Sequence, residues 1–286
     1  MHKTLISLAV ASTILFANAD SHETYKTVSD KVISEQRQHL IQNSKGKGFG
    51  PQAPRDITSV EGANNDVFSR APEKEKMNLC DIHFHKNAEH KGGDFNKYAG
   101  NGDGHGYHTG WTYSGTPLTH AEMKPTHEDI CPSEHGNLYP GDTIEVHYVY
   151  STAPGATLGN SLKTCLSQSV NNPQLRGEGQ IYVLVNDKKA ADFIELTKYG
   201  KINGRNQALN IPATTGTPVE YEGSTTGPTY DEKASPFQVS WSIRPKIMKV
   251  DISSVGKWCK DNIFKEDHAH GVRNIVKNKL LLSEIK

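Results

Sequence analysis

The chain has 286 residues, of which 22% are charged, and lysine plus arginine equals aspartate plus glutamate at 32 each. A chain without net charge offers no general attraction to nucleic acid or to an anionic membrane, so neither partner is expected. The fourteen histidines are the unusual feature of the composition, and many of them lie between residues 83 and 147.

The first nineteen residues have the features of a signal peptide. His2 and Lys3 begin a short polar region, residues 5–16 are apolar, and Ala17-Asn18-Ala19 has the A-x-A form of a signal-peptidase site. The apolar stretch is shorter than the about 20 residues that a membrane-spanning helix needs. We therefore expect residues 1–19 to be removed, leaving a periplasmic or secreted protein. A retained N-terminal anchor is the alternative.

Four cysteines follow the signal segment: Cys80, Cys131, Cys165 and Cys259. An even number of cysteines in an exported protein predicts two disulfides, although the sequence leaves three pairings open. Thiolate metal ligation is the competing use. It is less well supported, because no two cysteines are close enough in sequence to form a zinc-binding pair.

The remaining chain divides into a polar arm, residues 20–70, and one domain, residues 71–286. The arm contains a helical pattern around residues 28–42. In the domain, alternating or continuous apolar patterns predict strands at 77–86, 142–150, 180–186 and 237–243. Short helices are expected around 190–198 and after residue 255. We expect a mainly β fold, α+β by strict count, with a central twisted, largely antiparallel sheet and short peripheral helices.

The segment from Cys80 to His90 contains half of a metal site. His83 and His85 are two residues apart on a predicted strand, so their side chains project from the same face. A catalytic zinc usually takes three protein ligands and leaves the fourth position for water. The best third ligand is His147 on the strand at 142–150, where Glu145 and Val149 share its face.

Several separated pieces of the sequence resemble α-type carbonic anhydrases in their order and local spacing: His83-Phe84-His85, Glu89-His90, Glu145-Val146-His147, Gly223-Ser224-Thr225-Thr226 with Pro228, and Val239-Ser240-Trp241. The sequence from His83 to His90 resembles that of the δ-class carbonic anhydrases. The matched pieces span roughly residues 80–245. The resemblance implies an α-carbonic-anhydrase-like fold and an exported zinc enzyme.

The resemblance also implies roles for individual residues. His83, His85 and His147 match the three zinc ligands, and Glu145 matches the carboxylate that accepts a hydrogen bond from the third histidine. Residue types at these positions agree with that chemistry, since a neutral three-histidine site leaves zinc its full positive charge and lowers the pKa of bound water to about 7. Cobalt is an expected substitute for zinc.

Other matches concern the hydroxide and the substrate. The resemblance implies that the hydroxyl of Thr226 orients the zinc-bound hydroxide and donates to Glu89. Thr225 and Gly227 depart from the family pattern and predict a wider or wetter pocket. The resemblance also implies an apolar wall where carbon dioxide binds, formed by Val149, one of Val183 or Val185, and Trp241.

The family's usual proton-shuttle histidine has no obvious counterpart. A histidine on the long loop after residue 92 is expected to replace it, with His105, His108 and His120 as candidates, because an imidazole with a pKa of about 6.5 suits proton transfer. His268 and His270 also have H-x-H spacing. They lie in a charged tail without strand character, so we expect them on the surface.

The predicted function is zinc-dependent, reversible hydration of carbon dioxide to bicarbonate and a proton by a metal-bound hydroxide, which makes the enzyme a lyase, carbonate dehydratase. Two alternatives remain open. The same hydroxide would support a zinc-dependent esterase or other hydrolase, which a wider pocket favours. A secreted, non-catalytic metal-binding module is the other alternative, with the histidine-rich loop as its main feature.

Overall fold

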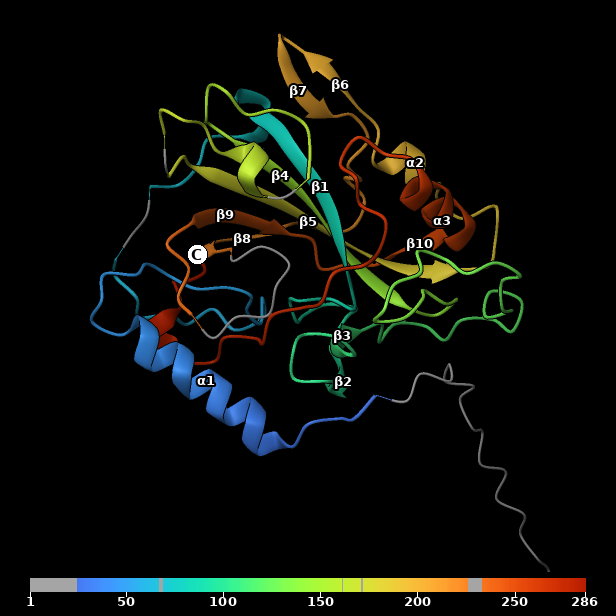
Figure 1. Cartoon of the computed structure of the whole chain (residues 1–286), viewed down its shortest axis with the longest axis horizontal. Coiled ribbons are helices and arrows are strands. Elements are labelled where there is room, and N and C mark those ends of the chain that lie inside the picture. The colour runs from blue at the N-terminus through green and yellow to red at the C-terminus, as the bar shows by residue number, and fades with distance from the viewer. Residues whose placement is uncertain (1–24, 67–68, 161, 171, 226–232) are drawn as a thin grey trace, which may run out of the picture.

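The fold is given by a computed structural model of the chain, shown in Figure 1. The structure describes residues 25–66, 69–160, 162–170, 172–225 and 233–286. Its main sheet has six strands: β1 (Asn78–Lys86), β4 (Thr143–Ser151), β5 (Leu175–Val185), β8 (Val219–Ser224), β9 (Gln238–Ile243) and β10 (Met248–Asp251). Two further sheets have two strands each: β2 (Lys97–Asn101) with β3 (Thr109–Thr112), and β6 (Tyr199–Ile202) with β7 (Arg205–Ala208).

The α-helices of the described residues are short or lie at the outside of the molecule (Figure 1): α1 (Asp30–Ser44), α2 (Phe193–Leu196) and α3 (Ile252–Lys260). Asp192 and Asp251 precede α2 and α3, and each carboxylate accepts a hydrogen bond from a backbone N–H of the first turn, which fixes the start of the helix. The prediction of a mainly β fold with short peripheral helices is confirmed.

The main sheet is mixed and centres on β4 and β5, which are buried at every position. Its order is β1-β4-β5-β9-β8. The pairings β1 with β4, β4 with β5, and β8 with β9 are antiparallel. β9 and β10 both run parallel to β5 and pair with successive parts of it, β9 with Leu175–Gly179 and β10 with Tyr182–Val185. The sheet is therefore largely antiparallel, as predicted.

The two faces of the sheet carry different side chains because strand residues alternate. On one face, Phe84 and Tyr148 belong to a core that includes Phe193 of α2 and Trp258 of α3. The opposite face carries a second core, whose buried members include Val149, Ile181, Val239 and Trp241. The histidines predicted to bind metal alternate with Ile82, Phe84 and Val146 of the first core, so they project toward the second.

The N-terminal arm packs against the domain. Leu40 of α1 contacts a small apolar cluster with Val276, Leu281 and Leu282 near the C-terminus. Farther along, Ile57 is buried in the second core and its N–H donates to the carbonyl of Lys91. Residues 1–19, which contain the expected signal peptide, lie outside the described residues. Within the described part of the chain, no helix is both long and apolar enough to span a membrane.

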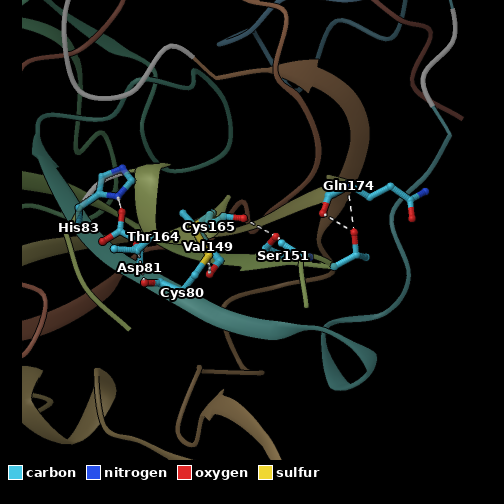
Figure 2. Close-up of a disulfide and its surroundings, with 10 residues drawn as sticks. Cys80, Asp81, His83, Val149, Ser151, Thr164, Cys165 and Gln174 are labelled. Carbon is cyan, nitrogen blue, oxygen red and sulfur yellow. Dashed lines mark hydrogen bonds and ion pairs between the residues drawn. A yellow bond between two sulfur atoms is a disulfide. The ribbon is translucent and has the colours of Figure 1, made fainter. Parts of the chain in front are cut away.

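Two disulfides cross-link the domain, which confirms the prediction from the cysteine count. Cys80 pairs with Cys165, and Cys131 pairs with Cys259. Figure 2 shows that the first of these attaches β1, one residue before Asp81, to the segment ending at Cys165. This disulfide therefore holds a loop next to the face of the sheet that carries the histidines.

Candidate metal centre

The strand register brings three predicted ligands together. In the antiparallel pair of β1 and β4, His83 lies opposite His147, and His85 lies opposite Glu145. Directly opposite side chains in such a pair have Cβ atoms about 4.5–5.5 Å apart. One ring nitrogen from each of His83, His85 and His147 lies within 4.8 Å of the others, and Nε2 of His83 is 3.2 Å from Nδ1 of His147.

Each of the three imidazoles is held by its other nitrogen. Nδ1 of His83 lies 2.7 Å from a carboxylate oxygen of Asp81, and Nδ1 of His85 lies 2.7 Å from the carbonyl oxygen of Gly271. Nε2 of His147 lies 2.8 Å from Oε1 of Glu145. Carboxylate and carbonyl oxygens only accept, so the N–H of each ring points outward and the opposite nitrogen presents its lone pair to the shared centre.

The environment of His85 fits a metal ligand. Its Nε2 is buried and has no hydrogen-bond partner, which is uncommon for a buried polar atom and calls for an explanation. Burial, together with the neighbouring rings of His147, His83 and His270, holds the pKa of His85 well below its ordinary value. The imidazole is therefore neutral at physiological pH, which is the form that binds a metal. A divalent cation would satisfy this nitrogen.

Glu145 is the centre of a buried hydrogen-bond network. Oε1 accepts from the rings of His147 and His90, and Oε2 accepts from the backbone N–H of His90 at 3.0 Å. Burial acts to raise the pKa of Glu145, but the charge of His90 and the hydrogen bonds from His147 and His90 outweigh it, so the pKa lies well below its ordinary value. Glu145 is accordingly a carboxylate that accepts three hydrogen bonds.

His90 has no ring nitrogen available for the metal position. Its Nδ1 contacts Glu145 at 2.6 Å and its Nε2 lies 2.6 Å from the hydroxyl of Tyr221. Burial raises the pKa of Tyr221 well above its ordinary value, so the phenol keeps its proton. Although His90, Glu145 and His147 are close enough to form another ligand group, hydrogen bonds between them account for their proximity.

A cavity of about 120 Å³ lies beside the histidine cluster, and of the three clustered histidines His83 lines it. Part of its wall is apolar and consists of Val149, Leu162, Gly177, Val239 and Trp241. The polar part of the wall contains His83 with Asp81, Asn160, Thr225, Glu266 and His270. The cavity is therefore small, and its apolar side faces a cluster of ionisable groups.

The predicted carboxylate, Glu89, lies beside a second cavity rather than on the wall of the first. Glu89 is buried, and its Oε1 accepts a hydrogen bond of 2.9 Å from the backbone N–H of Arg273. A smaller cavity is lined by Glu89, Thr225, Trp241 and other residues. Thr226 and Gly227 lie outside the described residues, so the pairing of Thr226 with Glu89 stays a prediction.

Other predicted residues lie elsewhere. Val183 and Val185 are buried in β5, beside β10 rather than β9, and neither lines the cavity. His105 and His120 are exposed, and His108 stacks on Tyr25. These three loop histidines are not among the residues that line the cavity.

Several residues that line the cavity were not predicted from the sequence. Val239 is two residues before Trp241 on β9, so alternation places it on the same face as Trp241, which the resemblance had identified. His270 was expected on the surface, but it lies beside the site. Its Nε2 is 2.5 Å from a carboxylate oxygen of the buried Glu266, and the centre of its ring is 5.8 Å from that of His83. It reaches the site through a bridge between residue 270 and His85, which no sequence pattern predicts.

The chain was compared with protein families, solved structures and curated proteins, and the family comparison identifies its family. The family model described as delta carbonic anhydrase matches residues 74–254. Among solved structures, the chain is similar to the alpha-carbonic anhydrase from Thermovibrio ammonificans in complex with the inhibitor sulfanilamide, at 16% identity and a TM-score of 0.26, over 82% of this chain and 86% of that one. A search of curated proteins finds no match.

Proposed function

This chain belongs to the delta carbonic anhydrase family, and its function is the hydration of carbon dioxide. We propose that this reaction uses a zinc ion and that His83, His85 and His147 hold it. One observation supports this assignment above the others: the Nε2 atom of His85 is buried without a partner at the point where the free nitrogens of His83 and His147 converge. Three neutral imidazoles are the donor set of a catalytic zinc site.

A zinc ion bound by three neutral histidines would supply hydroxide at neutral pH, because it would lower the pKa of a bound water to about 7. The residues of this chain supply orientation. Glu145 fixes His147 in the tautomer whose Nδ1 faces the centre, and the carbonyl of Gly271 does the same for Nε2 of His85. Both contacts involve buried groups, so the ligands are preorganised.

We assign the substrate to the apolar side of the cavity. Carbon dioxide has no net dipole and makes no strong hydrogen bonds, so Val149, Val239 and Trp241 are suitable neighbours for it. The small cavity volume suits a substrate of this size better than a larger ester. We propose that Glu89, oriented by the N–H of Arg273, accepts a hydrogen bond from the hydroxyl of Thr226.

The proposed location follows from the cysteines. Disulfides form and persist in oxidising compartments such as the periplasm and the extracellular space. Four cysteines engaged in two disulfides support export of this protein. We propose that residues 1–19 are a cleaved signal peptide and that the enzyme is periplasmic or secreted.

Stopped-flow hydration of carbon dioxide, measured with a pH indicator, tests the function. The processed protein, a His147→Ala variant and a His127→Ala control are compared, with zinc content determined for each; His127 is exposed. We expect about one zinc per chain and fast hydration for the parent and the control, and loss of both in His147→Ala. A parent that holds zinc but is no faster than buffer would contradict the proposed reaction and favour ester hydrolysis.

A further inference from the structure

A cavity of about 340 Å³ lies between α1 and residues 273–281 of the C-terminal segment. Figure 1 shows α1 at the outside of the molecule, and Leu40 of this helix packs against the C-terminal segment. None of the three clustered histidines lines this α1 cavity. Ligand pockets in proteins usually have volumes of about 300–1,000 Å³, so the α1 cavity is large enough for a small organic molecule.

The charged side chains in the wall of the α1 cavity are all cationic. Of the described residues that line it, Arg37, Arg273 and Lys277 carry positive charge and none is acidic. The guanidinium group of Arg273 donates to the carbonyl oxygens of Ala53 and Lys233, so it is already engaged inside the domain. Arg37 of α1 and Lys277 of the C-terminal segment remain as the cations of the cavity.

Arg37 and Lys277 are close enough to repel each other. The charge of Arg37 lowers the pKa of Lys277 below its ordinary value, with smaller contributions from burial and from Lys91. Nε of Arg37 is buried and has no hydrogen-bond partner among the described residues, which is uncommon for a buried donor. An anion between the two cations would accept hydrogen bonds from Arg37 and offset the repulsion.

The rest of the wall indicates what the anion carries. Leu40, Ile41 and Leu281 line the same cavity and provide it with an apolar surface. Arg37 and Ile41 are four residues apart on α1, so they are neighbours on one face of the helix. An inorganic ion would leave this apolar surface uncovered, whereas an organic anion would remove it from water.

We propose that the α1 cavity binds a small organic oxyanion with two negative charges on one group, the chemistry of a phosphate monoester. The planar guanidinium of Arg37 matches two oxygens of such a group, and the ammonium of Lys277 balances the second charge. The organic part of the ligand contacts Ile41 and Leu281. This site is separate from the histidine cluster, so the inference does not depend on the proposed zinc ion.

Isothermal titration calorimetry of the zinc-loaded, processed protein at pH 8 tests the proposal, with phenyl phosphate as the probe. The second pKa of a phosphate monoester is about 6, so the probe is doubly charged at this pH. We expect one binding site per chain. Inorganic phosphate lacks the apolar group and benzoate carries a single charge, so each should bind about 10-fold more weakly than phenyl phosphate.

Four variants locate the site. Arg37→Gln and Lys277→Gln should each weaken binding of phenyl phosphate by about 10- to 100-fold, the usual effect of losing a hydrogen bond to a charged group. Arg205→Gln is the matched control, because Arg205 is exposed on β7 and does not line the α1 cavity. His147→Ala lacks a proposed zinc ligand and should bind the probe as tightly as the parent.

A parent that does not bind phenyl phosphate would overturn the proposal, and so would an Arg37→Gln protein with parental affinity. Loss of binding in His147→Ala would place the anion at the metal centre and reject the α1 cavity as its site. Equal affinity for inorganic phosphate and phenyl phosphate would exclude an organic ligand. If Arg37→Gln fails to fold, Lys277→Gln decides the question, because Lys277 is exposed and its substitution leaves the core unchanged.

Discussion

Glu145 accepts a hydrogen bond from Nε2 of His147 at 2.8 Å, and this contact determines which nitrogen of His147 faces the metal position. Oε1 also accepts from the ring of His90, and Oε2 accepts from the backbone of His90. Glutamine at position 145 has only one accepting oxygen, so its NH₂ group would face a donor in either orientation. At least one buried N–H would then lose its acceptor.

We therefore predict that Glu145→Gln lowers zinc affinity by about 10- to 100-fold and the free energy of unfolding by about 1–3 kcal/mol. Chelator competition and urea unfolding measure the two effects. Glu195→Gln is the control, because the Glu195 side chain is 59% exposed. Unchanged zinc affinity in Glu145→Gln would show that Glu145 does not set the tautomer of His147.

Gly177 determines the position of Trp241 in the cavity wall. The two residues are direct neighbours on β5 and β9, and a Cβ atom at position 177 would lie 2.6 Å from the indole ring. The ring cannot retain its place, although its N–H donates to the carbonyl of Ser224. Gly177→Ala should therefore destabilise the protein by about 1–3 kcal/mol, as overpacking does.

The same substitution should lower kcat/KM by up to about 10²-fold while zinc content is retained, because the apolar wall moves but the ligands do not. Gly155→Ala is the control, since the nearest atom to its added Cβ would be at 3.5 Å. Stopped-flow kinetics and zinc analysis on the three proteins provide the test. A Gly177→Ala enzyme with parental kinetics would exclude Trp241 from the substrate wall.

The cluster of three histidines was predictable because its signal is local. H-x-H and E-x-H on strands place side chains on one face by alternation alone, and the structure places the ligand nitrogens of His83, His85 and His147 together. The place of Asp81 could have been predicted in the same way, since it lies two residues before His83 on the same strand. The strand at 78–86 was also predicted to within one residue.

The substrate wall was less predictable because it depends on which strands pair. The expectation of Val183 or Val185 required the second half of β5 to face the histidines, but β9 pairs with the first half, at Leu175–Gly179. Such registers between distant strands leave no periodic signal in the sequence. His270 was missed for the same reason, because a backbone bridge between residues 185 positions apart places it beside His85.

The disulfide between Cys80 and Cys165 should matter for activity as well as for stability. It closes a separation of 85 residues, and that between Cys131 and Cys259 closes 128, so removal of either should cost about 2–5 kcal/mol. Only the first is attached to the loop that brings Leu162 to the cavity.

We predict that the Cys80→Ala/Cys165→Ala enzyme loses kcat/KM at temperatures where it is still folded. The Cys131→Ala/Cys259→Ala enzyme should retain it. Urea unfolding and stopped-flow kinetics on both double variants make the comparison. Equal kinetic losses would mean that the first disulfide has no special relation to the cavity.

Glu222 on β8 should give a pH-dependent stability that is separate from the metal site. Burial raises the pKa of Glu222, although hydrogen bonds from Ser240 oppose the shift. The folded state therefore holds the proton to a higher pH than the unfolded state. Between the unfolded and folded pKa values the folded protein binds more protons, so stability falls as pH rises through this window and stays reduced above it.

Glu222→Gln removes this unfavourable ionisation, so the variant should be more stable than the parent at pH 7. The expected gain is at most about 1 kcal/mol, since one pKa unit corresponds to about 1.4 kcal/mol and partial exposure reduces the effect. Urea unfolding from pH 3.5 to 8 tests it, with the exposed Glu284→Gln as control. The difference should shrink toward pH 3.5, where Glu222 is protonated in both states. A difference that stays constant over the whole range would mean that packing, rather than charge, distinguishes the two side chains.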